Sequence, residues 1–230
     1  MLTAGLGGGT GTGALPVIAS RVKDELKGVL VVSIVTLPFS AEGIQRIKNA
    51  QMGLAEVMDV SDMVIVNSND LMLEKLGGRR VPISRAFKVM DKHLVDTISA
   101  IVDLQSLEPR PGLINIDFSN IEYLTREAGL GIVGIGSGRT VSIALEEAVR
   151  NNYCNADITN CKGAAVCVEG YEAMIDIHEL EEIPRVLSSR YNISTVFWGV
   201  KSNWRLHTPK VMVYATGVKS EYVEKYLKGI

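Results

Sequence analysis

Several features that mark common protein classes are missing from this sequence of 230 residues. Its 24 lysines and arginines are balanced by 26 aspartates and glutamates, so it lacks the basic surplus that binding to a nucleic-acid backbone usually requires. No apolar run approaches the roughly 20 residues of a membrane span, and residues 1–13 lack the pattern of a signal peptide. We therefore expect a globular, cytoplasmic protein with no nucleic-acid partner and no direct insertion into a membrane.

Cysteine is also scarce, with three residues in the chain. Cys154, Cys161 and Cys167 show no C-x-x-C spacing with nearby histidines, which argues against both a metal site and a disulfide framework. The three histidines are scattered and lack a partnered serine or cysteine pattern, so a hydrolase triad is poorly supported as well. We expect buried thiols and no metal site.

The first half of the chain alternates apolar runs with helical patterns. Residues 28–36 and 62–68 are apolar throughout rather than alternating, which is typical of parallel strands covered on both faces. Apolar residues recur at helical spacing in residues 12–26 and 41–60. These patterns predict an α/β domain built on a Rossmann-like parallel sheet.

A long helix is predicted for residues 84–104, where apolar side chains form one stripe from Phe87 to Val102. Ser84 is suited to cap its start, and the two prolines in residues 108–112 disfavour its continuation. Because this helix follows the first domain and precedes a change of pattern, we expect it to form the central spine of the fold.

Short apolar runs beyond residue 112 predict a second sheet in a smaller α/β domain, with helices between the strands. The expected strands are residues 131–136, 163–169, 195–202 and 210–217, and the expected helices are residues 120–128, 140–151 and 177–191. We therefore divide the chain into a truncated nucleotide-binding domain, a core helix and an independently folding C-terminal domain. Their predicted bounds are residues 1–83, 84–106 and 107–230.

A glycine-rich loop, GGGTGTG at residues 7–13, lies between a short apolar stub and a predicted helix. Such a loop lets backbone N–H groups approach an anion, and the start of the following helix favours negative charge there. A flexible connector would explain five glycines and two threonines at a helix start less well. The loop therefore predicts phosphate binding by Gly7, Gly8, Gly9, Thr10, Gly11, Thr12 and Gly13.

Two familiar phosphate loops fit this segment poorly. A Walker loop needs Lys and then Ser or Thr after its last glycine, whereas Ala14 and Leu15 follow here. A dinucleotide fingerprint can be placed on Gly9, Gly11 and Ala14, yet the next strand ends at Thr36 rather than at an acid that would hold a ribose. A Rossmann-type dinucleotide-dependent enzyme stays open as an alternative.

GGGTGTG resembles the signature loop of the tubulin and FtsZ family, and the resemblance continues along nearly the whole chain. The segment TLPFSAEGIQR at residues 36–46 is similar to the FtsZ segment whose Glu and Arg touch the nucleotide, which implies these roles for Glu42 and Arg46. Asn69 resembles the first member of the Asn-Asp pair in the next loop of the family. The implied cofactor is GTP or GDP, with Mg²⁺ expected alongside GTP.

The family resemblance extends into the long helix, where AFKVMDKHL at residues 86–94 implies a phenylalanine against guanine at Phe87 and a carboxylate on the base edge at Asp91. A carboxylate accepts both the N1–H and the N2 amine of guanine, whereas adenine offers no such donor pair, so Asp91 would select GTP over ATP. Taken alone, Phe87 would be interpreted as core and Asp91 as a solvated charge. Their joint spacing favours the binding role.

The segment GLINIDFSNI at residues 112–121 resembles the catalytic loop that FtsZ inserts into the nucleotide site of the next subunit. Asn115 and Asp117 match that loop, and the resemblance implies that the Asp117 carboxylate polarises the water attacking the γ-phosphate. Asn120 departs from the family pattern, which has a second acid there. Because an amide orients water but takes no proton, we expect slow turnover and longer-lived filaments.

The resemblance implies a cell-division GTPase that forms head-to-tail filaments with itself or with a complete FtsZ-like relative. The first strands of the family, with a further glycine-rich loop, have no counterpart here, so we expect a fragment, a truncated gene product or one half of a split protein. Alone, the chain should bind GTP weakly and hydrolyse it negligibly. The alternative in this class is a non-catalytic protein that caps or modulates filaments, which the truncation and Asn120 favour.

Overall fold

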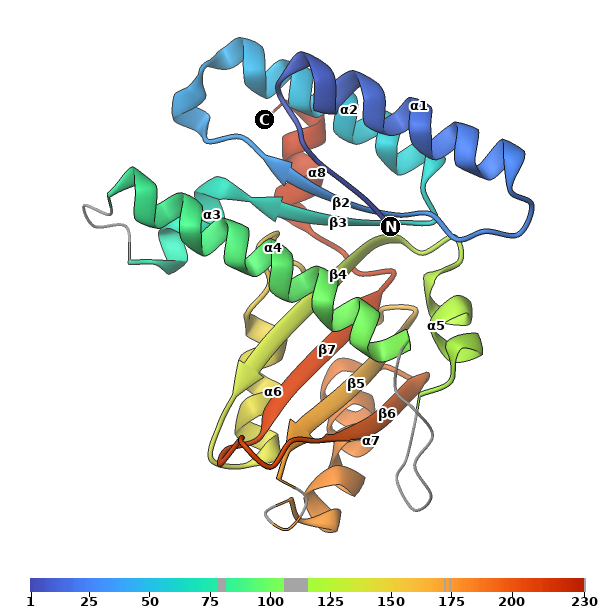
Figure 1. The fold of residues 1–230 in the computed structure, drawn as a ribbon, viewed down its shortest axis with the longest axis vertical. Coiled ribbons are helices and arrows are strands. Elements are labelled where there is room, and N and C mark those ends of the chain that lie inside the picture. The colour runs from blue at the N-terminus through green and yellow to red at the C-terminus, as the bar shows by residue number, and fades with distance from the viewer. Residues whose placement is uncertain (78–81, 106–115, 172, 174, 230) are drawn as a thin grey trace.

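The computed structural model describes the chain except for residues 78–81, 106–115, 172, 174 and 230 (Figure 1). Its strands form one seven-stranded sheet in the order β1-β2-β3-β4-β7-β5-β6. The strands are β1 (Leu2–Gly5), β2 (Val32–Leu37), β3 (Met63–Ser68), β4 (Gly129–Ser137), β5 (Gly163–Gly170), β6 (Val196–Ser202) and β7 (Lys210–Thr216). The helices are α1 (Gly9–Glu25), α2 (Ile44–Val60), α3 (Asn69–Lys75), α4 (Ile83–Gln105), α5 (Phe118–Thr125), α6 (Val141–Arg150), α7 (Ile177–Tyr191) and α8 (Glu221–Lys228), with a 3-10 turn η1 at Ser40–Glu42.

The sheet is parallel through β1, β2, β3 and β4, and mixed beyond β4. The α/β class expected from the sequence is therefore confirmed, but the second sheet is not a separate one. Strand β4 pairs with β3 from Met63↔Gly129 to Ile65↔Gly131 and so joins the two halves into one sheet. Apolar patterns predicted the individual strands well. They did not predict which strands pair, because pairing depends on contacts between residues that are far apart in the sequence.

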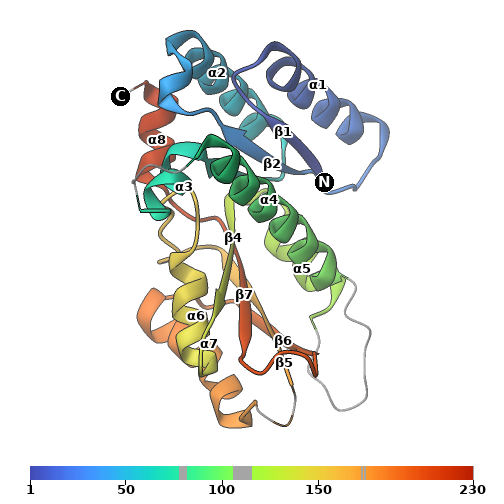
Figure 2. The same cartoon turned by 60° about the vertical axis from the view of Figure 1, so that its left-hand side comes forward.

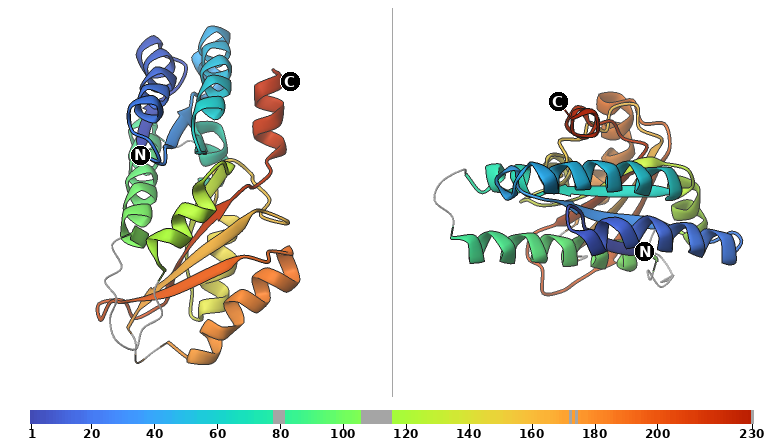
Figure 3. Two further views of the ribbon diagram at one scale, coloured as in Figure 1. Left: turned by 90° about the vertical axis from the view of Figure 1, so that its right-hand side faces the viewer. Right: turned by 90° about the horizontal axis from the view of Figure 1, so that it is seen from above.

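The fold has three layers, with helices on both faces of the sheet (Figures 2 and 3). Alternate residues of β2 divide between the two cores: Val35 and Leu37 belong to the core on the side of α1 and α2, whereas Val32 and Ile34 belong to the core that includes the C-terminal half of α4. Because both faces are covered, the strands are apolar throughout, as the sequence indicated.

Helix α4 runs along the sheet as the predicted spine, but its buried stripe differs from the predicted one. The buried residues of its first five turns are Ala86, Met90, His93, Thr97, Ala100 and Ile101. Phe87 and Val102 are instead 44% and 42% exposed. Ser84 lies inside the helix rather than at its cap, since the helix begins at Ile83. Burial lowers the pKa of His93 to about 4, so its ring packs as a neutral aromatic group.

Two helices, α3 and α8, were not predicted from the sequence. Helix α8 packs against α2, and the Tyr222 hydroxyl lies 2.7 Å from the Ser68 hydroxyl at the end of β3. Ser220 caps α8 by accepting a hydrogen bond from the Val223 N–H. The C-terminal segment therefore returns to the first half of the fold, and the predicted three-part division of the chain stays a proposal.

Replacement of Gly134 by alanine is expected to destabilise the fold strongly. A Cβ atom there would lie 1.9 Å from the Ala148 carbonyl oxygen of α6, so strand and helix must move apart. Overpacking of this kind costs about 1–3 kcal/mol, and more where the obstacle is backbone. Urea unfolding of Gly134→Ala beside Gly5→Ala, which has no heavy atom within 4 Å of its added Cβ, measures the difference. Equal stability of the two variants would contradict the close approach of α6 to β4.

Candidate functional site

A pocket of about 360 Å³ opens at the carboxyl ends of β1, β2 and β3, the edge of a parallel sheet where ligands commonly bind. It collects side chains from five elements that are distant in the sequence. Its lining residues are Gly5, Leu6, Gly8, Thr36, Pro38, Glu42, Arg46, Asn69, Phe87, Met90, Asp91 and Leu94. The size lies within the range of small-molecule sites.

The turn that enters α1 has a fixed shape. The Gly7 N–H donates to the Thr12 hydroxyl at 2.9 Å, and the Asn49 side chain donates to the Gly7 carbonyl at 3.2 Å. Gly7 has φ +104°, and a Cβ atom on it would lie 3.0 Å from the Arg46 carbonyl oxygen. Only glycine suits this position, and Thr12 serves the shape of the loop itself.

No side chain caps the start of α1 or brings negative charge to its first turn. Helix α1 begins at Gly9 after Gly8, which provides no side-chain cap, and its first turn holds no acidic residue. The first N–H groups of a helix carry partial positive charge and need acceptors. Added Cβ atoms on Gly8, Gly9 and Gly13 would meet nothing within 4 Å in the described structure. The exposed backbone at this helix start is therefore suited to bind an anion.

A charged pair lies at the rim of the pocket. Arg46 of α2 and Glu42 of η1 form an ion pair at 2.5 Å, and the other Glu42 oxygen accepts a hydrogen bond from the Phe39 N–H at 2.9 Å. Asp70 fixes the same turn by accepting from the N–H and the hydroxyl of Ser40. The pair gives this side of the pocket one positive and one negative group that are exposed enough to contact a ligand.

The opposite wall is formed by the first turns of α4. Phe87 and Asp91 are four residues apart and therefore lie on one face of the helix, where both line the pocket. Phe87 is partly exposed and packs edge to face with Phe39, with ring centroids 6.1 Å apart. A flat aromatic base can stack on the ring while its polar edge meets the Asp91 carboxylate.

The predicted catalytic residues lie elsewhere. Asp117 is exposed at the start of α5 and makes no side-chain capping bond, and the Asn120 N–H donates to the Asp117 carbonyl at 3.0 Å. Asn115 lies outside the described residues. Ile116 packs in the same cluster as Leu104, near the far end of α4. The rise of a helix places Leu104 about 26 Å from Phe87 along the axis, so Asp117 and the pocket are well separated.

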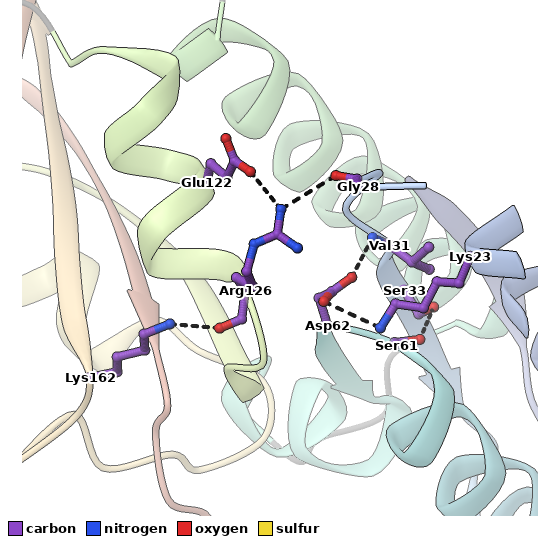
Figure 4. A network of polar contacts seen from close by, with 9 residues as sticks. All are labelled: Lys23, Gly28, Val31, Ser33, Ser61, Asp62, Glu122, Arg126 and Lys162. Carbon is purple, nitrogen blue, oxygen red and sulfur yellow. Dashed lines mark hydrogen bonds and ion pairs between the residues drawn. The ribbon is translucent and has the colours of Figure 1, made fainter. Parts of the chain in front are cut away.

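Polar contacts anchor α5 at the amino ends of the strands (Figure 4). Arg126, directly after α5, donates to the Gly28 carbonyl at 3.3 Å and pairs with Glu122 at 2.5 Å. Lys162 donates to the Arg126 carbonyl at 2.6 Å. Since the pocket opens at the carboxyl ends of the same strands, one copy of the chain presents the two groups of predicted site residues on opposite edges.

Comparison with known proteins assigns the chain to a family. The GTPase-domain model of the tubulin/FtsZ family matches residues 1–77. The FtsZ 1 cell division protein of Pyrococcus abyssi is 40% identical over 227 residues, which cover 96% of this chain, and that of Halobacterium salinarum is 35% identical over the same share. This chain belongs to the tubulin/FtsZ family.

The chain spans only part of its relatives, namely 59% of the Pyrococcus protein and 55% of the Halobacterium protein. An empty FtsZ dimer from M. jannaschii superposes with a TM-score of 0.80 at 34% identity, over 94% of this chain and 62% of that one. CetZ2 from Haloferax volcanii, in a GTPγS-bound protofilament, superposes with a TM-score of 0.79 at 21% identity, over 99% of this chain and 67% of that one, which supports the fold alone.

Six of the predicted nucleotide-binding residues line the pocket at the carboxyl ends of β1, β2 and β3: Gly8, Glu42, Arg46, Asn69, Phe87 and Asp91. The other loop residues differ in placement. Gly7 and Thr12 shape the turn, Gly11 packs against β1, and Gly9, Thr10 and Gly13 are exposed along the start of α1. The binding and catalytic roles of all these residues stay predictions.

Several lining residues were not predicted, among them Thr36, Met90 and Leu94. Thr36 is the last polar residue of an apolar strand, a signal that could have pointed to the carboxyl edge of the sheet. Met90 and Leu94 have the spacing of ordinary core residues in an amphipathic helix, so the sequence alone does not identify them as pocket residues. Within the described ranges, no group of three or more His, Cys, Asp and Glu is arranged to hold a metal ion, and no helix is long and apolar enough to cross a membrane.

Two glycines of the loop should respond to alanine in opposite directions. Gly13 lies inside α1 with open space around its Cβ position, so Gly13→Ala should raise the unfolding free energy by about 0.5–1 kcal/mol through helix propensity. Gly11→Ala should lower the unfolding free energy, because its Cβ would lie 2.3 Å from the Gly5 carbonyl oxygen. Urea unfolding without nucleotide tests both. Destabilisation by Gly13→Ala would show that the loop is packed more tightly than the structure describes.

Proposed function

We propose that this chain is an FtsZ-type GTP-binding protein that forms head-to-tail filaments in cell division and hydrolyses GTP between neighbouring copies. The observation that carries the proposal is the separation of the pocket from Asp117 on opposite edges of one sheet. A second copy stacked in the same orientation brings the exposed Asp117 of one copy over the pocket of the next. Contacts of this head-to-tail kind repeat along a filament.

Each part of the pocket has a role in this proposal. The bare N–H groups at the start of α1 bind the phosphates, and Phe87 stacks on the guanine while Asp91 accepts from its edge. Glu42 and Arg46 contact the nucleotide from the rim. Mg²⁺ in such sites is held largely by the phosphates, with one or two protein oxygens, so its presence with GTP stays part of the proposal. The comparisons do not favour a dinucleotide-dependent enzyme.

The nucleotide selectivity of the pocket should depend on Asp91. Loss of its two charge-assisted hydrogen bonds in Asp91→Ala should weaken GTP binding by about 100- to 10,000-fold and remove the discrimination against ATP. Isothermal titration with GTP and ATP measures both effects. Asp96→Ala is the matched control, because Asp96 lies on the same helix, pairs with Lys92 and does not line the pocket. Unchanged discrimination in Asp91→Ala would rule out the assigned role.

Hydrolysis should be limited by the amide at position 120. Asn120→Asp restores a group that takes a proton, so phosphate release should rise by at least about tenfold. The gain should grow with protein concentration, because the residue acts on the nucleotide of a neighbouring copy. Ser119→Asp adds the same charge to the adjacent exposed position of α5 and serves as the control. An equal effect of the two variants would indicate a general charge effect, and no effect would favour the non-catalytic capping alternative.

A further inference from the structure

Two buried amide atoms at the end of β3 lack hydrogen-bond partners among the described residues. They are the Asn67 side-chain nitrogen and the Asn69 side-chain oxygen, in residues that are 4% and 6% exposed. Buried polar groups are nearly always satisfied, so such an exception requires a cause. The residues that precede Asn67 on the same face of β3 are Met63 and Ile65, which belong to the apolar core. An apolar residue would therefore suit position 67 if packing alone decided it.

Asn69 lines the candidate nucleotide pocket, and Asn67 lies beside lining residues of that pocket. Asn67 is in register with Thr36 of β2, and side chains in register on parallel strands lie on one face at a spacing of about 4.8 Å. Thr36 lines the pocket, and so does Asn69 two residues after Asn67. Asn67 is therefore flanked by two lining residues, one on the neighbouring strand and one further along its own chain.

The two unpartnered atoms have opposite hydrogen-bonding sense, since the Asn67 nitrogen donates and the Asn69 oxygen accepts. A hydroxyl group both accepts and donates and so satisfies the two atoms together. A phosphate oxygen offers only an acceptor, and an amine of the base only a donor. We propose that Asn67, together with Asn69, binds a ribose hydroxyl of the nucleotide at the pocket floor. This inference rests on the proposed function, because it requires that the pocket takes GTP.

Binding and stability should respond differently to Asn67→Leu. Leucine has a similar volume and removes an unsatisfied amide, so the unfolding free energy in the absence of nucleotide should stay equal or rise. GTP affinity should fall by about tenfold, the loss expected for a ligand hydrogen bond left unmade. Isothermal titration and urea unfolding of the 230-residue chain measure the two quantities.

Asn152→Leu is the matched control for this test. Asn152 is 5% exposed, and its amide is fully engaged: the nitrogen donates to the Val149 and Ala156 carbonyls, and the oxygen accepts from the Ala156 N–H. It does not line the pocket. Asn152→Leu should therefore destabilise the fold and leave the GTP affinity of the folded protein unchanged. Destabilisation by Asn67→Leu without loss of affinity would instead mark Asn67 as structural and overturn the inference.

Deoxynucleotides identify the group that the two asparagines bind. If it is a ribose hydroxyl, 2′-deoxy-GTP or 3′-deoxy-GTP should bind the unchanged chain about tenfold more weakly than GTP, and Asn67→Leu should add no further loss for that analogue. Equal binding of GTP and both analogues would assign the amides to a trapped water and overturn the inference alone. An absence of saturable GTP binding to the unchanged chain would overturn the proposed function as well.

Discussion

The short pairing between β3 and β4 is the contact on which the rest of the architecture depends. It joins the parallel and the mixed halves of the sheet from Met63↔Gly129 to Ile65↔Gly131. Asp62, at the entry to β3, strengthens it: its carbonyl accepts from the Ala128 and Gly129 N–H groups, and its buried carboxylate accepts from the Val31 N–H. Lys23 of α1 balances that carboxylate at 3.2 Å. One residue therefore connects the entries of three neighbouring strands. Figure 4 shows its contacts with Val31 and Lys23.

This junction also accounts for the separation of the two predicted site regions. Because β2 and β3 are parallel, their amino ends meet at Asp62, where Arg126 and Lys162 hold α5, and their carboxyl ends meet at the pocket. The spine helix α4 connects the two edges, with Phe87 at one end and Leu104 at the other. The parallel arrangement of β2 and β3 therefore forms the pocket at one edge of the sheet and keeps the Asp117 of the same chain at the other edge.

Much of the fold could be predicted because its strands and long helices are regular. Helix α7 was predicted at its observed bounds, and the other predicted strands and helices lie within a few residues of theirs. Helices α3 and α8 were missed because they are short and depend on tertiary contacts, such as that of Tyr222 with Ser68. The pocket residues found from the sequence came from a motif resemblance. Asn67 was missed because its placement depends on its register with Thr36, which no local pattern encodes.

The glycines of the loop fall into two groups, those that the surrounding backbone requires and those with open space around them. Gly7 and Gly11 are required by the backbone that surrounds them, because a Cβ atom would lie 3.0 Å from the Arg46 carbonyl oxygen at Gly7 and 2.3 Å from the Gly5 carbonyl oxygen at Gly11. Gly8 and Gly9 have no such neighbours, and a capping Ser or Asp at position 8 would stabilise α1 by roughly a few tenths of a kcal/mol. The helix start instead keeps its N–H groups uncapped and free of acidic side chains. The hydrogen-bonding capacity that the fold leaves unused at this position is therefore available to an anionic ligand, which stabilises the folded chain when it binds.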